Sequence, residues 1–206
     1  MLKLSRIEKS FGDKKVLSDV SLHVKKGMCV MLFGMSGCGK TTLLRIAAGL
    51  EKQDGGDVER SAKTAIVFAE PRLFPTATVT ENVTAVMSRR DKKESKKKAA
   101  EILEAFGLGG AEGLYPSALS TGMSARVSLA RAVAYDADIY LMDEPFKSLD
   151  PDIKQSVISY LKPFFANKAV MMISHDRAEA DLMGAEVYRM ENGVLIKETE
   201  IPKPAV

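Results

Sequence analysis

Residues 34–41 read Gly-Met-Ser-Gly-Cys-Gly-Lys-Thr, and this stretch decides the fold. It follows Met28–Phe33, a continuous apolar run of six residues that is typical of a strand buried on both faces of a parallel sheet. It precedes leucines and alanines at helical spacing between Leu43 and Leu50. A strand, a glycine-rich loop and a helix in this order are the context in which the pattern G-x-x-x-x-G-K-[ST] binds phosphate.

The residue types of this loop suit a polyphosphate. Glycines let the backbone curl so that several N–H groups face one point, and the following helix adds the positive end of its dipole. Lys40 would place its ammonium against the β- and γ-phosphates, and the Thr41 hydroxyl would ligate Mg²⁺. We therefore expect a nucleotide phosphate site in this loop.

The chain has two cysteines, and one of them lies inside this loop. We favour the simple interpretation that Cys38 is a small residue which the loop tolerates. The sharper hypothesis is that alkylation of Cys38 blocks ATP binding and that bound ATP protects it, because a thiol at an anion-binding helix N-terminus is reactive. Cys29 falls within the buried strand and is expected to be inert. Neither cysteine has metal-ligand spacing, and two thiols make no disulfide framework, so a reducing cytoplasm is expected.

A second informative segment is Ile139–Pro145, in which the apolar run Ile139–Met142 is followed by two carboxylates. Asp143 would hold Mg²⁺ through water, and Glu144 stands where a general base could polarise an attacking water. The pair alone is a weak signal, but together with the phosphate loop upstream it indicates the two halves of a nucleotide site.

Around these motifs, the apolar patterns predict an α/β fold with a mainly parallel sheet. The first 26 residues are expected to form short strands around a turn at Gly12, and a hairpin is expected around Asn192-Gly193. Helical spacing predominates from about Arg72 to Ala134. We expect a single domain with an antiparallel β subdomain at the N-terminus. Its core would span about 1–71 and 136–206, and a helical subdomain would be inserted at about 72–135.

Composition excludes several classes of protein. Apolar residues make up 46% of the 206 residues, which excludes a disordered chain. Thirty basic against 27 acidic residues leave a net charge of +3, too mild to argue for a nucleic-acid partner. The longest apolar run has six residues, whereas a membrane span needs about 20. We expect no membrane crossing and see no secretory signal in Met1–Gly12.

Over about residues 1–198, the chain resembles the nucleotide-binding subunit of ABC transporters. The resemblance rests on motifs that occur in the family's order. They are the Walker A loop (Gly34–Thr41), the signature (Leu119–Met123), the Walker B strand (Leu141–Glu144), the D-loop (Ser148–Asp150) and the switch histidine (His175). Residues 73–83 resemble the segment of importer-type cassettes that contacts the permease. The nearest subfamily resemblance is to cassettes for nitrate, sulfonate and taurine-like substrates.

This resemblance implies a RecA-like P-loop NTPase core and an ATPase that powers transport, with import favoured. Two cassettes pack head to tail, as a homodimer or a heterodimer, with ATP and Mg²⁺ between them. Transmembrane permease subunits and an external substrate-binding protein are further implied partners, with no nucleic acid. The cassette would lie in the cytoplasm, on the inner face of the membrane.

The resemblance also assigns roles to single residues. Glu144 and His175 are the implied catalytic residues, and Thr41 and Asp143 hold the metal ion. The residues implied in ATP binding, either on the chain's own side or towards the second cassette, are Phe11, Gly34, Ser36, Gly37, Cys38, Gly39, Lys40, Thr41, Thr42, Ser120, Gly122 and Asp150. By position alone, Phe11 is as readily an ordinary strand aromatic and His175 a structural histidine.

Two positions depart from the family pattern. Ala69 stands where the family has a glutamine that reaches Mg²⁺ and the attacking water, and the neighbouring Glu70 should point to the opposite side. Thr121 replaces the first glycine of the signature pair. We predict a slow ATPase, or one that depends strongly on its partner.

Two alternatives remain beside a transport ATPase. One is a degenerate nucleotide-binding module that acts in a heterodimer or as an ATP-dependent regulator. Ala69 and Thr121 favour it, whereas the intact Lys40, Glu144 and His175 oppose it. The other is a soluble ABC protein that acts on ribosomes or DNA, but such proteins carry two cassettes or long coiled-coil insertions.

Overall fold

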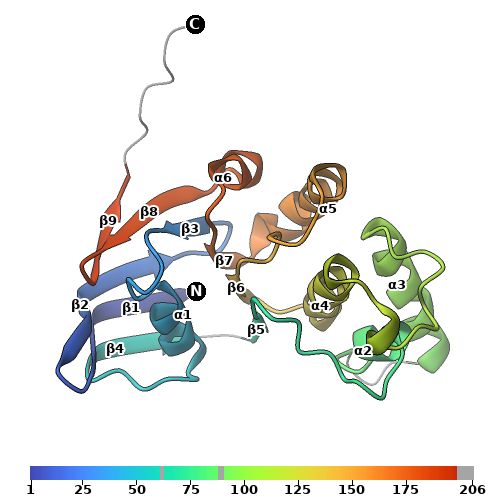
Figure 1. The fold of residues 1–206 in the computed structure, drawn as a ribbon, viewed down its shortest axis with the longest axis horizontal. Helices are drawn as coiled ribbons and strands as arrows, with labels where there is room; N and C mark the ends of the chain where they lie inside the picture. Colours follow the sequence, from blue (N-terminus) through green and yellow to red (C-terminus); the bar gives the residue numbers. More distant parts are fainter. Residues whose placement is uncertain (61–62, 88–90, 199–206) are drawn as a thin grey trace, which may run out of the picture.

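The computed structural model describes residues 1–60, 63–87 and 91–198 and has two sheets with helices around them (Figure 1). Strands β1 (Leu2–Phe11), β2 (Lys14–Val24) and β4 (Gly55–Arg60) form an antiparallel sheet in the order β2-β1-β4. The turn at Gly12 is confirmed, but β1 and β2 are 10 and 11 residues long rather than short.

Strand β4 is absent from the sequence prediction. Gly55, Gly56 and Asp57 are poor strand formers, so the segment lacks a strand pattern of its own. Pairing with β1, which sets Leu4 opposite Val58, overrides this local preference. The strand exists because β1 offers it a free edge.

The second sheet has six strands in the order β5-β6-β7-β3-β8-β9. Its bounds are β3 (Cys29–Phe33), β5 (Thr64–Val67), β6 (Ile139–Asp143), β7 (Ala169–Ile173), β8 (Glu186–Glu191) and β9 (Val194–Lys197). Every neighbouring pair is parallel except β8 and β9, which confirms the mainly parallel sheet. Asn192 and Gly193 both have positive φ, as a two-residue hairpin turn of type I′ requires, so the predicted hairpin is confirmed.

The helices are α1 (Lys40–Ala48), α2 (Val79–Thr84), α3 (Lys92–Ala105), α4 (Thr121–Tyr135), α5 (Pro151–Phe164) and α6 (Arg177–Met183), with 3₁₀ turns η1 (Pro116–Ala118) and η2 (Phe165–Asn167). The expected helical region contains α2, α3 and α4, which gather at the right of Figure 1. Helices α5 and α6 were not predicted from the sequence. For α5 the signal is present in the sequence, because Val157, Ile158 and Leu161 recur at helical spacing and are buried.

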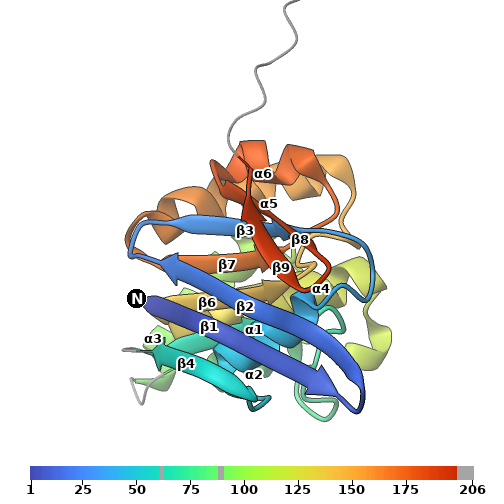
Figure 2. The same ribbon diagram turned by 90° about the vertical axis from the view of Figure 1, so that its left-hand side faces the viewer.

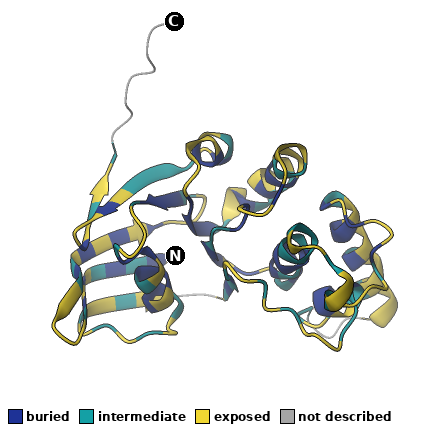
Figure 3. Cartoon of the chain, in the orientation of Figure 1, coloured by how far each residue is buried: buried dark blue, intermediate teal, exposed yellow. Residues whose placement is uncertain are grey.

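The six-stranded sheet separates two apolar cores. Met31, Tyr140 and Met172 face the core shared with α2–α5, whereas their neighbours along the strands, such as Leu32 and Leu141, face the core under α1 and the three-stranded sheet. Figure 3 shows the central strands β3, β6 and β7 buried over most of their length. This two-sided burial explains why the strands read as unbroken apolar runs.

Seen from the side in Figure 2, β1, β2 and β4 lie across the front of the parallel strands. The chain leaves the carboxyl ends of β3, β6 and β7 into Gly34, Glu144 and Ser174. In open α/β sheets, ligands bind at such carboxyl ends. Within the described residues, the helices are too short or too polar to cross a bilayer.

Candidate functional site

The phosphate loop follows β3 and has an unusual backbone. Gly34, Gly37 and Gly39 have φ of +143°, +78° and +110°, in the region that favours glycine. A Cβ at Gly34 would collide with the backbone carbonyl of Met190, and one at Gly39 would lie 2.9 Å from the carbonyl oxygen of Val16. The glycines are therefore needed both for the loop's curl and for its close approach to neighbouring strands.

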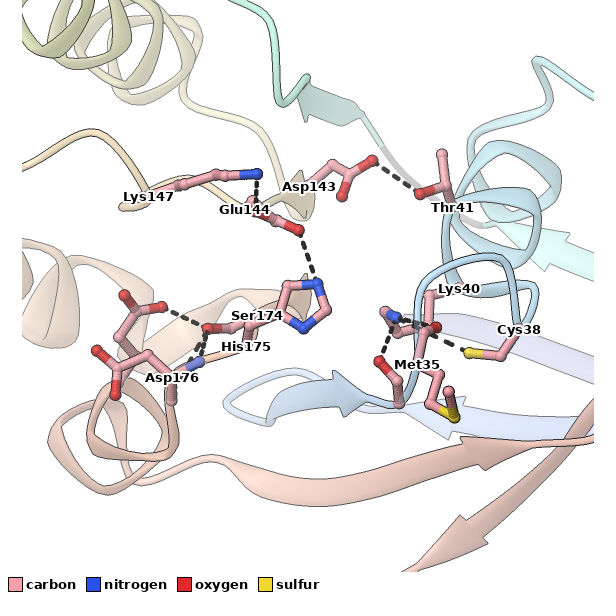
Figure 4. Close-up of polar contacts among 12 residues, drawn as sticks. Met35, Cys38, Lys40, Thr41, Asp143, Glu144, Lys147, Ser174, His175 and Asp176 are labelled. Carbon is pink, nitrogen blue, oxygen red and sulfur yellow. Dashed lines mark hydrogen bonds and ion pairs between the residues drawn. The ribbon is translucent and has the colours of Figure 1, made fainter.

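Lys40 is the first residue of α1 and is buried, with 6% of its surface exposed. Its Nζ donates to the carbonyl oxygens of Gly34 at 2.7 Å and Met35 at 2.9 Å, and lies 3.8 Å from Sγ of Cys38. The ammonium is thus held by the loop's own carbonyl oxygens (Figure 4). From this position it would reach phosphate oxygens bound in the loop.

Opposite the loop, the Thr41 hydroxyl donates to Oδ2 of Asp143 at 3.1 Å. Burial raises the pKa of the Asp143 carboxyl. The hydrogen bond from Thr41 opposes this shift, and the nearby Glu144 carboxylate adds to it. A hydroxyl and a carboxylate are hard oxygen ligands of the kind that Mg²⁺ prefers, and a cation here would relieve the cost of the ionised carboxylate. These two residues therefore fit the metal that the sequence implies.

Glu144 lies beyond the end of β6 with φ of +47°, which is uncommon for a residue with a side chain. Its backbone N–H donates to the carbonyl oxygen of Ile173 at 3.0 Å, so the pairing of β6 and β7 extends to this residue. The carboxylate is mostly buried. Its Oε1 lies 2.9 Å from Nε2 of His175 and its Oε2 lies 3.0 Å from Nζ of Lys147 (Figure 4). The fold therefore brings the two implied catalytic residues into contact.

Four other residues implied in nucleotide binding lie at the end of β1, in the phosphate loop and in α1. Phe11, at the end of β1, is half exposed, with Nζ of Lys9 5.0 Å from its ring centre. Ser36 and Gly37 are exposed at the tip of the phosphate loop, and Thr42 lies in the first turn of α1. These positions leave each residue accessible to a nucleotide.

The signature residues lie against the D-loop. Oγ of Ser120 accepts a hydrogen bond from the backbone of Met123 and caps α4, while a Cβ on Gly122 would lie 2.7 Å from the carbonyl oxygen of Ser148. Asp150 caps α5 by accepting from the backbone of Ile153 at 3.1 Å. In this single chain both polar side chains serve as helix caps.

Sequence reasoning missed two groups beside the catalytic pair. Lys147 lies between the Walker B strand and the D-loop and carries no motif signal. Lys154 and Glu179 come from α5 and α6, and their Nζ and Oε1 atoms are 2.7 Å apart. Because 25 residues separate these two, only the packing of their helices reveals the pair.

Comparisons with known proteins agree with this geometry. Residues 17–147 match the family model described as ABC transporter. An aliphatic sulfonates import ATP-binding protein of Rhodococcus jostii is 38% identical over 197 residues, which cover 92% of this chain and 71% of the relative. A sulfate/thiosulfate import ATP-binding protein of Chromobacterium violaceum is 40% identical over 206 residues, which cover 93% of this chain and 56% of the relative. The chain thus spans little more than half of that second protein.

Solved structures extend the likeness to the whole fold. The dimeric ABC transporter cassette MJ0796 superposes with a TM-score of 0.87 at 27% identity, covering 98% of this chain and 100% of that one. A second structure of the same cassette, in a dimeric post-hydrolysis state with ADP and phosphate, superposes equally well. The RecA-like α/β fold and the resemblance to sulfonate-type cassettes are confirmed.

Proposed function

The chain belongs to the ABC transporter ATP-binding family, and from this premise we propose that it hydrolyses ATP to drive a membrane importer. The observation that carries the proposal is that the implied phosphate-binding, metal-binding and catalytic residues lie together at one end of the sheet. The phosphate loop and Thr41 face Asp143, and Glu144 contacts His175 at 2.9 Å. A phosphate cradle, a metal-ligand pair and a base with its partner are the parts that phosphoryl transfer to water needs.

Each residue has a role in this proposal. The backbone of the loop and Lys40 hold the β- and γ-phosphates, and Thr41 and Asp143 hold Mg²⁺. The metal ion would neutralise phosphate charge when bound. The carboxylate of Glu144 orients the attacking water and accepts its proton, while Nε2 of His175 contacts Oε1 and holds that carboxylate in place.

A second cassette completes the site. We assign Phe11 to the adenine ring, and Ser120, Gly122 and Asp150 to the ATP held by the other cassette. The exposure of Phe11 supports this assignment, as does the dimeric state of a structural relative. Residues 72–135 form the helical subdomain in this arrangement, and residues 1–71 and 136–206 the core. Residues 61–62, 88–90 and 199–206 lie outside the described residues. A homodimer is the simplest assembly.

The substrate class and location come from the relatives. Because the curated relatives are named for importing aliphatic sulfonates and sulfate or thiosulfate, we propose that the partner permease imports a sulfur oxyanion. An external binding protein would deliver the substrate. The cassette would lie at the inner face of the membrane through its permease.

We further propose that turnover is slow. Ala69 is exposed in the loop after β5 and offers only a methyl group where the family glutamine would reach the metal ion. Thr121 is exposed at the first turn of α4 and adds a side chain where backbone would approach the γ-phosphate of the other site.

The first experiment compares Mg²⁺-dependent ATP hydrolysis of the wild type and of Glu144→Gln, with size-exclusion chromatography in ATP. We expect hydrolysis in the wild type only, and an ATP-trapped dimer of Glu144→Gln. ATP binding without turnover or dimerisation in either form would contradict the proposal and support the degenerate module. Ala69→Gln then tests the slow turnover and should raise kcat without changing ATP affinity.

A further inference from the structure

Four charged or polar residues lie beside the catalytic pair and have no role in the chemistry proposed above. We call them the Lys154 cluster, which consists of Lys154, Ser174, Asp176 and Glu179. Ser174 and Asp176 flank His175 in the chain. All four members of the cluster line the same hollow of about 270 Å³ as Glu144 and His175.

Glu179 is the centre of the cluster. It lies in the first turn of α6 and is buried, with 3% of its surface exposed. Its Oε2 accepts from Oγ of Ser174 at 2.6 Å and its Oε1 accepts from Nζ of Lys154 at 2.7 Å. A buried carboxylate is costly unless it is paired and hydrogen-bonded, so these two contacts account for its presence.

The contacts continue into the loop that carries His175. The Ser174 hydroxyl accepts from the backbone N–H of Asp176 at 3.0 Å, and Nζ of Lys154 also donates to Oδ2 of Asp176 at 3.0 Å. The residues before and after His175 are therefore both tied to the cluster (Figure 4). The backbone that presents the imidazole to Glu144 has little freedom to rotate.

The ion pair between Lys154 and Asp176 stabilises the charged form of both side chains. Burial by itself would lower the pKa of Lys154, but its hydrogen bonds to Glu179 and Asp176 outweigh burial and the pKa lies above its usual value. The hydrogen bond from Lys154 in turn lowers the pKa of the Asp176 carboxyl. The ammonium of Lys154 and the carboxylate of Asp176 thus stay ionised near neutral pH.

Lys154 also connects the cluster to the D-loop. It lies one turn into α5, and its backbone N–H donates to the carbonyl oxygen of Asp150 at 2.9 Å. Asp150 is the residue that we assign to the second cassette's ATP. A shift of the α5 N-terminus would therefore move Lys154 and, through Glu179, the loop that holds His175.

We propose that Lys154, Glu179 and Ser174 position His175 against Glu144, and that they carry the position of the D-loop helix to that catalytic contact. They act through His175 and do not touch the reacting atoms. This inference rests on the proposed ATPase function and adds three positioning residues to it.

The kinetic test uses the whole chain with Lys154→Met and Glu179→Gln. We expect kcat to fall about tenfold while the Kd for a non-hydrolysable ATP analogue stays within about twofold, since the phosphate loop is unchanged. Lys154→Arg should restore most of the rate because it keeps the ion pairs. In a His175→Ala background, Lys154→Met should cause no further loss, since its target is gone.

Lys168→Met is the matched control. Lys168 has nearly the same side-chain exposure as Lys154, 18% against 19%, and also pairs with a carboxylate, Asp136, at 2.8 Å. It does not line the hollow beside Glu144. Lys154→Met could fail to fold because it leaves Glu179 unpaired, so the charge-neutral double variant Lys154→Met/Glu179→Gln is made as well.

A second readout does not depend on hydrolysis. The chain has only two histidines, His23 and His175, so the imidazole NMR signals of His175 can be assigned with a single substitution. Cluster variants should shift these signals, whereas Lys168→Met should not. Unchanged His175 signals in folded cluster variants, or equal kcat losses with and without His175, would overturn the positioning role. A wild type that does not hydrolyse ATP would instead refute the proposed function, while the NMR result still decides the positioning.

Discussion

Glu144 has partners at both carboxylate oxygens before any nucleotide enters, and the contact with Lys147 is the one that a substitution can remove cleanly. Lys147 is 71% exposed, and exposed ion pairs are worth at most about 1 kcal/mol. Lys147→Ser frees Oε2 for water, so we expect the basal kcat to rise, by no more than about fivefold. Lys26→Ser, at another exposed lysine, is the control in a steady-state ATPase assay. A lower kcat in Lys147→Ser would mean that the lysine assists the base.

The ionised carboxylate of Asp143, the implied metal ligand, lowers the stability of the fold when no cation is bound to it. Its pKa lies above the ordinary 3.8, so the ionised form destabilises the fold at neutral pH, and protonation relieves this cost as the pH falls. Without Mg²⁺, Asp143→Asn should raise Tm at pH 7, because the amide carries no charge that burial would penalise. The gain should shrink as the pH falls through the raised pKa and vanish below 3.8, where Asp143 is protonated in both the folded and the unfolded state.

Thermal unfolding followed by circular dichroism checks this prediction, with Asp181→Asn on the exposed face of α6 as control. The same Asp143→Asn variant should lose Mg²⁺-dependent hydrolysis. An Asp143→Asn variant less stable than the wild type at pH 7 would show that the hydrogen bond from Thr41 outweighs the cost of the buried charge.

The two cysteines differ in environment. Burial raises the pKa of the Cys29 thiol to about 12, which leaves almost no thiolate at neutral pH, whereas Cys38 lies on the phosphate loop. We expect N-ethylmaleimide to modify Cys38 first and abolish ATP binding, and bound ATP to protect the thiol. Mass spectrometry locates the label and a fluorescent ATP analogue reports binding. Normal ATP binding by the alkylated protein would leave Cys38 as a small residue that the loop tolerates.

At the scale of elements, the N-terminus of α4 fits closely against the D-loop. A Cβ on Gly122 would lie 2.7 Å from the backbone oxygen of Ser148. Because the contact is with backbone, it can be relieved only if α4 or the D-loop moves. Gly122→Ala should therefore displace α4 from the D-loop and weaken ATP-driven dimerisation about tenfold, while ATP binding to the monomer persists. Dimerisation is measured by sedimentation in the Glu144→Gln background.

Gly113→Ala is the matched control for this substitution, because no atom lies within 4 Å of its built Cβ. It should dimerise like the parent protein. Equal dimerisation of both glycine variants would show that the contact between α4 and the D-loop does not shape the interface.

At the scale of the whole molecule, one sheet joins two cores. Leu141 and Met142 are neighbours on β6 but belong to opposite cores. Leu141→Ala and Met142→Ala should each lower the free energy of unfolding by about 2 to 5 kcal/mol, the usual cost of truncating a buried side chain. Both should shift a single urea transition, because neither core can lose the sheet alone. A two-step transition in either variant would show that the helical region unfolds independently.

Much of the molecule follows from the sequence by itself. The phosphate loop with its glycines and Lys40 follows the apolar strand β3, the two carboxylates lie at the end of β6, and the histidine lies just beyond β7. Parallel strands deliver their carboxyl ends to one edge, so a local pattern predicts a shared site. Burial of the sheet on both faces likewise leaves its mark as continuous apolar runs.

Only the tertiary structure decided the remaining features. Strand β4 exists because β1 has a free edge, not because its glycines favour a strand. Lys147 pairs with Glu144 across the turn that follows β6, in which the Lys147 backbone N–H donates to the carbonyl oxygen of Glu144. Lys154 meets Glu179 because α5 and α6 pack together. Charges on a helix surface look alike in a sequence. Which of them are buried and paired depends on the packing of distant elements, and this is what separates a solvated lysine from one that holds the catalytic histidine in place.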